Sequence, residues 1–122
     1  MTINDHSMPD AGSLLDGKQF KSMADALGDD FGAIIDEFFE SCESFKNRLD
    51  ESLGDGDVGR FRKICHEIKG ASGLIGFRAI SAAAADWEAT AASGQLPADA
   101  RLIETFKRLL SDTRAHVGSL EK

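Results

Sequence analysis

The chain is 122 residues long, and 42% of its residues are apolar and 29% charged, which is the composition of one folded domain and not of a disordered chain. Acidic residues outnumber basic ones by 21 to 14, and the net charge of -7 disfavours nucleic acid or an anionic membrane surface as the partner. No apolar run approaches the ~20 residues of a membrane span, and the N-terminus lacks the features of a secretory signal. We therefore expect a cytoplasmic monomer in which Cys42 and Cys65 are buried, reduced thiols.

Residues 1–17 are polar and turn-rich, and we expect them to form a flexible lead-in to a domain over residues 18–122. A short helix is expected over about residues 18–27. Asp29 and Asp30 favour the start of a long helix, because acidic side chains suit the positive end of the helix dipole. The apolar stripe of this helix is spaced by threes and fours: Phe31, Ile34, Ile35, Phe38, Cys42, Phe45, Leu49 and Leu53.

Three more helices follow the GDGD break at 54–57. The first carries an apolar stripe at Val58, Phe61, Ile64, Ile68, Ala71 and Ile75. The second begins at Phe77 and has its stripe at Ile80, Ala84, Trp87 and Ala91. Pro97 suits the first turn of the last helix, whose stripe is Leu102, Ile103, Phe106, Leu109, Leu110, Val117 and Leu120. Four amphipathic helices with short connections predict an all-α fold, an antiparallel up-down four-helix bundle with an additional short N-terminal helix.

One histidine of the third long segment stands out, within the stretch HEIKGASGLIG at residues 66–76. On a helical wheel that advances about 100° per residue, the apolar stripe lies opposite His66, which therefore points to water. Arg62, Lys63 and Lys69 share its strip, on a protein that is otherwise acidic.

Glycines occupy the same strip, although each costs a helix interior about 1 kcal/mol relative to alanine. Gly70 and Gly73 lie one and two turns beyond His66, where missing side chains let the surface of another molecule come close to the imidazole. Gly76 is expected to be a turn or backbone-contact glycine, where the third helix gives way to the fourth.

This arrangement suits the holding of a phosphoryl group. A neutral imidazole is a competent nucleophile near pH 7. The group that it accepts carries about two negative charges, which nearby cations offset. Lys69 is the best placed of these cations, and Lys63 and Arg62 can assist it.

Other chemistry at His66 is disfavoured. A metal site needs three or four convergent ligands, but Cys65 lies about 100° round the helix and no HxxxH pair exists. His6 is in the lead-in, and His116 has no paired ligand at helical spacing. Ser72 falls on the wrong side of the helix for a hydrolytic pair. We expect no metal site and no hydrolase.

The motif resembles that of a known family. HEIKG at residues 66–70, followed by Gly76, resembles the HxxKGxxxxxG signature of histidine-containing phosphotransfer (HPt) domains. The likeness covers roughly residues 30–115, and Trp87-Glu88 stands where that family often has Leu-Glu.

The resemblance implies a helical bundle that works in a multistep, two-component phosphorelay. His66 would accept a phosphoryl group on Nε2 from a receiver-domain aspartate and pass it to another. Lys69 would steady its charge, Gly70 would open the approach, and Gly76 would be structural. The partners would be receiver domains of response regulators or of a hybrid histidine kinase, with the receiver supplying Mg²⁺ and this chain binding no cofactor and having no kinase activity.

Two residues depart from the family pattern, Glu67 and Trp87, and neither is expected to touch the phosphoryl group. Docking is expected to use the His66 face of the helix with Leu74 at its edge, in a small and transient contact. The alternative is a helical adaptor that binds a kinase or receiver without carrying phosphate.

Overall fold

The computed structural model describes residues 14–120, which form helices joined by short connections. The helices are α2 (Gly17–Leu27), the 3-10 turn η2 (Gly28–Asp30), α3 (Phe31–Asp55), α4 (Val58–Ile75), α5 (Arg78–Ala92) and α6 (Leu102–Leu120). The predicted helical segments are therefore confirmed, with small differences at their ends.

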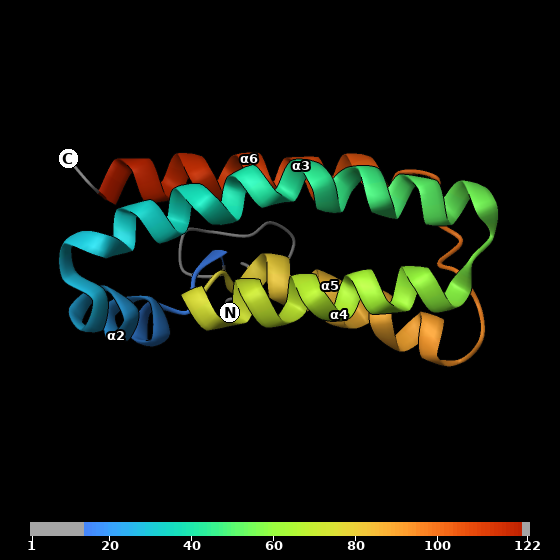
Figure 1. The fold of residues 1–122 in the computed structure, drawn as a ribbon, viewed down its shortest axis with the longest axis horizontal. Helices are drawn as coiled ribbons and strands as arrows, with labels where there is room; N and C mark the ends of the chain where they lie inside the picture. Colours follow the sequence, from blue (N-terminus) through green and yellow to red (C-terminus); the bar gives the residue numbers. More distant parts are fainter. Residues whose placement is uncertain (1–13, 121–122) are drawn as a thin grey trace, which may run out of the picture.

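The four long helices run up and down in two layers (Figure 1). Helix α3 lies beside α6 in one layer, and α4 lies beside α5 in the other. Between the layers, α3 contacts α4 and α5 contacts α6, so each of the four helices packs against two others. The predicted all-α four-helix bundle is confirmed.

The core is built from the apolar stripes that the periodicity predicts. Phe61, Phe77 and Phe106 are fully buried at its centre. Both cysteines are buried and free of a disulfide, as expected. Burial raises the pKa of the Cys42 and Cys65 thiols to about 12, because a thiolate would lose its hydration there.

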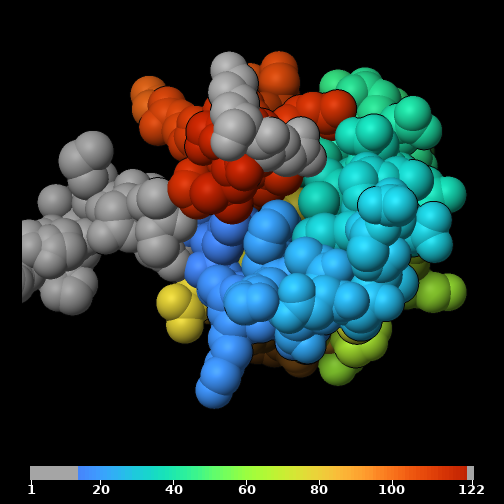
Figure 2. All heavy atoms as spheres, turned by 90° about the vertical axis from the view of Figure 1, so that its left-hand side faces the viewer, coloured from blue at the N-terminus to red at the C-terminus, as the bar shows by residue number. Residues whose placement is uncertain are grey.

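Helix α2 packs across one end of the bundle, between α3 and α4 (Figure 2). The Asp16 carboxylate accepts a hydrogen bond from the backbone N–H of Gln19 and so caps α2. The backbone N–H of Asp16 donates to the Gly76 carbonyl at 2.8 Å, and the Gln19 side chain donates to the Leu74 carbonyl at 2.7 Å. These two bonds join the beginning of α2 to the end of α4.

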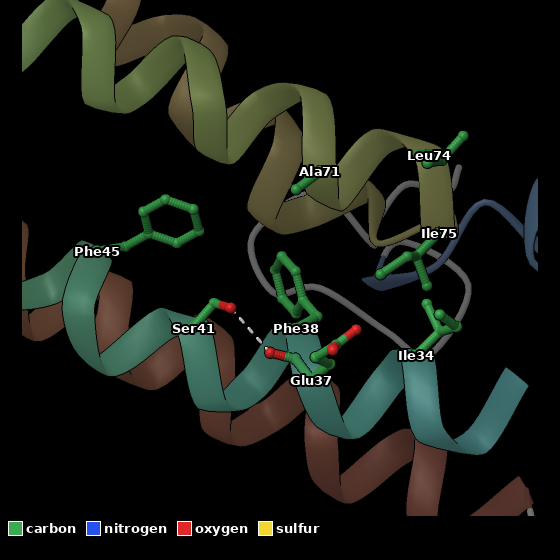
Figure 3. Close-up of a pocket in the computed structure, with 8 residues that line it drawn as sticks. All are labelled: Ile34, Glu37, Phe38, Ser41, Phe45, Ala71, Leu74 and Ile75. Atoms are coloured by element: carbon green, nitrogen blue, oxygen red, sulfur yellow. Dashed lines mark hydrogen bonds between the residues drawn. The ribbon is translucent and has the colours of Figure 1, made fainter.

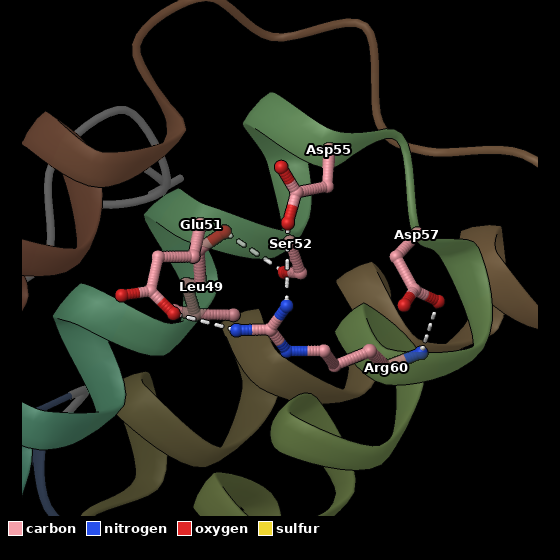
Figure 4. A network of polar contacts seen from close by, with 6 residues as sticks. All are labelled: Leu49, Glu51, Ser52, Asp55, Asp57 and Arg60. Atoms are coloured by element: carbon pink, nitrogen blue, oxygen red, sulfur yellow. Dashed lines mark hydrogen bonds and ion pairs between the residues drawn. The ribbon is translucent and has the colours of Figure 1, made fainter.

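The opposite end holds the tight turn from α3 to α4 (Figure 4). Gly56 ends α3 with a φ of 69°, a left-handed conformation that glycine adopts without strain. Asp57 caps α4 by accepting the backbone N–H of Arg60 at 3.1 Å. The Arg60 guanidinium reaches back to Glu51 at 2.6 Å and to Asp55 at 3.4 Å, so the turn is clamped by charge as well as by backbone geometry.

The last helix starts later than predicted. Pro97 lies in the α5–α6 connection, five residues before α6, and the prediction that it occupies the first turn is wrong. Asp99 sets the start instead. Its carboxylate accepts the Arg101 N–H at 2.9 Å, and its carbonyl accepts the Leu102 N–H at 3.1 Å.

Both ends of the described chain differ from expectation. Leu14 and Leu15 are buried, so the packed domain begins before residue 18 and the predicted boundary is too late. Residues 1–13 lie outside the described residues. Leu120, expected in the core stripe of the last helix, is 52% exposed and is the last residue of α6.

Candidate functional site

His66 lies in the middle of α4, with 68% of its side chain exposed. Ile64 and Ile68, on the opposite side of the helix, are fully buried, and so is the adjacent Cys65. The outward orientation predicted from the periodicity is confirmed.

A carboxylate on the next helix holds the inner side of the imidazole. Oε2 of Glu88, on α5, lies 2.9 Å from Nδ1 of His66. The Glu88 side chain is only 16% exposed. Since a carboxylate can only accept a hydrogen bond, the proton between them belongs to Nδ1, and Nε2 of the neutral ring keeps its lone pair.

The same carboxylate binds the lysine of the motif. Nζ of Lys69 lies 2.7 Å from Oε1 of Glu88, so the two oxygens bind two different side chains of α4. The hydrogen bond from Lys69 is the largest cause that holds the pKa of Glu88 below its ordinary value, and the bond to His66 acts in the same direction. Partial burial opposes both and is outweighed. Glu88 is therefore an ionised bridge between α5 and α4.

The other predicted cations have different surroundings. Arg62 and Lys63 are exposed, and within residues 14–120 neither forms an ion pair. Their charges remain available to an anion near His66. Glu67 turns to the other side of α4 and pairs with Arg48 of α3 at 3.2 Å, away from the His66–Glu88 contact.

The two predicted clearance glycines differ. A Cβ built on Gly70 would meet nothing within 4 Å, so the space beside His66 is open there. A Cβ on Gly73 would lie 3.2 Å from the Ser81 hydroxyl of α5. Gly73 is exposed, but its missing side chain also leaves room for the Ser81 hydroxyl of α5, so the open space at Gly73 is narrower than at Gly70. The Ser81 hydroxyl in turn donates to the Lys69 carbonyl at 3.2 Å.

Gly76 closes the end of α4, as predicted. Its φ of 93° is one that other residues rarely adopt. A Cβ there would lie 2.7 Å from the backbone nitrogen of Phe20 in α2. Gly76 is required both by its turn and by the backbone that packs against it.

An apolar groove of about 370 Å³ runs between α3 and α4, on the side of α4 away from α5 (Figure 3). Its lining residues are Ile34, Glu37, Phe38, Ser41, Phe45, Ala71, Leu74 and Ile75. Leu74, one turn beyond Gly70, is 60% exposed at its rim. The groove and the open space at Gly70 therefore adjoin on α4.

Glu88 is the site residue that the sequence reasoning missed. In the sequence, Glu88 stands out only as part of Trp87-Glu88, at a position where the resembling family often has Leu-Glu. This position in the family pattern is the sequence signal that could have identified Glu88 as a site residue. A second signal is its place beside Trp87 in the apolar stripe of α5, where Trp87 packs on Phe106 at a ring distance of 6.2 Å. A side chain adjacent to a core residue lies at the edge of the helix interface, where it can reach α4.

Within residues 14–120, no group of three or more histidine, cysteine or acidic side chains could hold a metal ion. No helix in the same range is long and apolar enough to cross a membrane.

Fold and site together define a class of protein, a four-helix bundle that presents one histidine to solvent with a carboxylate behind it and a lysine beside it. The family model described as "Hpt domain" matches residues 33–116, which is more than half of the chain. The chain belongs to the Hpt domain family.

A solved structure agrees with this assignment. The crystal structure of histidine-containing phosphotransfer protein B (HptB) from Pseudomonas aeruginosa PAO1 is 25% identical in sequence and superposes with a TM-score of 0.77. The match covers 84% of this chain and 89% of that chain. No curated protein sequence matches. Family membership makes the chain a histidine phosphotransfer domain of the phosphorelay type, whose family interacts with receiver domains and histidine kinases.

Proposed function

We propose that the protein is a monomeric phosphoryl carrier without kinase activity of its own. His66 accepts a phosphoryl group from the aspartyl phosphate of a receiver domain and passes it to a second receiver aspartate. One observation carries this proposal: the His66 ring is exposed, and its Nδ1 is bound by Glu88, which leaves Nε2 as the nucleophilic atom that faces outward.

The transfer needs only positioning and charge. The Nε2 lone pair attacks phosphorus, the bond from phosphorus to the aspartyl oxygen breaks, and the aspartate leaves as a carboxylate. The open space at Gly70 admits the receiver's loops close to the ring. The receiver domain supplies Mg²⁺, and this chain binds no metal of its own.

Lys69 is the first cation available to the incoming phosphoryl group. Its Nζ is held 2.7 Å from Glu88 and one helical turn from His66, so a modest rotation brings it to the phosphoryl oxygens. Lys63 and Arg62 add positive potential on the same strip. With these cations the charge of the phosphorylated state is offset without burial.

The receiver docks along α4 beside His66 and over the adjoining groove. The exposed Leu74 and the apolar lining of the groove offer contact area next to the reacting atoms. Such an interface is small, which suits a carrier that must release each partner after transfer.

The decisive experiment incubates a phosphorylated receiver with the wild-type protein and with His66→Gln. We expect label on the wild type alone, labile in acid and stable in alkali, and its transfer onward to a second receiver. Label on neither protein, with binding retained, would instead identify a helical adaptor. The control is His116→Gln, which changes a histidine of α6 outside the site and should leave labelling unchanged.

A further inference from the structure

A second groove lies between α3 and α6, in the layer of the bundle that does not contain His66 (Figure 1). Its volume is about 310 Å³, and its lining residues are Phe39, Cys42, Glu43, Lys46, Lys107, Leu110, Ser111 and Arg114. On a helical wheel of α3, Phe39 lies on one side of the buried stripe, whereas Phe45, which lines the α3–α4 groove, lies on the other. The two grooves therefore open on different faces of the bundle.

The charge of the α3–α6 groove is opposite to that of the chain. Three of its lining residues are cations and one is a carboxylate, which gives a net charge of +2, whereas the whole chain carries -7. Glu43 pairs with Lys46 at 2.9 Å, and Arg114 lies 3.7 Å from Asp36. Lys107 forms no ion pair with any residue between 14 and 120. An acidic partner is thus repelled by the molecule as a whole and attracted at this groove.

The cations stand at the two ends of the groove. The Arg114 guanidinium lies over the Phe39 ring, 4.9 Å from its centroid. Helices α3 and α6 are antiparallel, so moving seven residues from this contact along both helices brings Lys46 opposite Lys107. Seven helical residues span about 10 Å. The groove therefore has one positive end at Arg114 and another, about 10 Å away, at the two lysines.

Between these ends the groove is apolar. Cys42, 2% exposed, and the half-buried Leu110 form this middle part. A guanidinium that stacks on an aromatic ring still has N–H groups in its plane with which to bind a carboxylate. We propose that the α3–α6 groove binds an acidic segment of a partner protein, which places an apolar side chain on Cys42 and Leu110 and a carboxylate at each end.

The segment binds on a different face from the receiver that docks at His66. A partner held in the groove stays attached while His66 remains accessible, which raises the effective concentration of its other domains near the histidine. Single exposed ion pairs are weak, so the affinity depends on the two charged ends and the apolar contact acting together. Binding in the groove needs no phosphoryl group and is measured without one.

The test follows the fluorescence anisotropy of a short labelled peptide that has glutamates on both sides of two central leucines. The salt concentration is kept at about 50 mM, where surface charges are weakly screened. The double variant Lys107→Glu/Arg114→Glu should bind the peptide about tenfold more weakly than wild type, or worse. The control Arg101→Glu/Arg108→Glu changes the net charge by the same amount at exposed positions outside the groove, and it should bind within about twofold of wild type.

Three results would overturn the proposal. Equal losses in the two double variants would mean that the peptide senses only the overall charge. Equal binding of a peptide with glutamines in place of glutamates would mean that the cations have no part in recognition. Equally tight binding of a thymidine oligonucleotide would mean that the groove selects polyanions and not an acidic protein segment. Circular dichroism of each variant checks that the bundle is intact.

A last measurement separates this groove from the phosphotransfer site. Saturating peptide should leave the rate of His66 labelling by a phosphorylated receiver unchanged, and a large fall would place the peptide on the His66 face and overturn simultaneous binding. If the wild type takes no label at all, the proposed function fails, while the anisotropy data still decide whether the groove binds an acidic segment.

Discussion

Gly70 and Gly76 belong to one short motif on one helix, and they lie in opposite surroundings. Gly70 faces open space beside an exposed histidine. Gly76 is buried, has a φ of 93°, and lies directly against the backbone of Phe20. The absence of a side chain gives access to a partner in the first case and closes the fold in the second. The same residue type therefore predicts opposite effects of mutation.

The largest expected effect is on stability, at Gly76, where α4 ends against α2. Gly76→Ala should destabilise the protein by about 3 kcal/mol or more, since left-handed strain and overpacking each cost about 1–3 kcal/mol. Urea unfolding followed by circular dichroism measures it. Gly56→Ala is the matched control, because Gly56 also has a positive φ, 69°, but a Cβ there meets nothing within 4 Å. It should cost about 1–2 kcal/mol. Equal losses in the two variants would mean that α2 does not press on Gly76.

At Gly70, which faces open space, a substitution should slow phosphoryl transfer without lowering the stability of the fold. Gly70→Leu should be at least as stable as wild type, because leucine is favoured over glycine in a helix by about 0.5–1 kcal/mol. Phosphoryl transfer to His66 should fall about tenfold or more, since a near-attack geometry tolerates little displacement of the receiver. Quenched-flow labelling from a phosphorylated receiver measures the rate.

The control for this prediction is Gly54→Leu, at an exposed position of α3 near the opposite end of the bundle where a Cβ also meets nothing within 4 Å. It should gain a similar amount of stability and transfer at the wild-type rate. Equal transfer rates in Gly70→Leu and Gly54→Leu would remove the clearance argument.

Gly73 lies between these two extremes and tests where the open region ends. Alanine at this position gains helix propensity of about 1 kcal/mol but meets the Ser81 hydroxyl at 3.2 Å, so the net change in stability should be within about 1 kcal/mol. In a Ser81→Ala background the same substitution should stabilise by about 0.5–1 kcal/mol, because the contact is gone. A double-mutant cycle measured by urea unfolding gives the coupling. Additive effects would show that the Ser81 hydroxyl does not crowd a side chain at position 73.

Periodicity alone predicted what depends on one helix. The helices, the buried stripe of α4 and the outward direction of His66 follow from the spacing of apolar residues within a segment. The neighbour of Gly73 and the role of Glu88 could not be predicted in this way, since both depend on how α5 is rotated against α4. A wheel shows which face a residue occupies but not which helix covers that face.

The start of α6 shows a second limit, set by local competition. Pro97 is compatible with a first helical turn, and so is Asp99 two residues later as a cap. The carboxylate and carbonyl of Asp99 accept the N–H groups of the next turn and decide the outcome. Propensity gives both choices, and only the hydrogen bonds of the folded chain distinguish them.

The smallest expected effect is a pH dependence of stability, which should be seen at the His66 site but not at Gly76. The pKa of Glu88 is lowered in the folded state, first by the hydrogen bond from Lys69. A carboxyl with a lowered folded pKa contributes stability that is present above its ordinary pKa of 4.5 and is lost as the pH falls through the folded value. The difference in unfolding free energy between wild type and Glu88→Gln should thus be constant above pH 4.5 and shrink below it.

Lys69→Met removes the hydrogen bond that lowers the pKa of Glu88 most, so in that background the loss of stability from Glu88 should begin at a higher pH. The cost of Gly76→Ala, which comes from strain and contact between uncharged atoms, should not change over the same range. A Glu88→Gln difference that is independent of pH would mean that the bridge between α5 and α4 contributes through shape and not through charge.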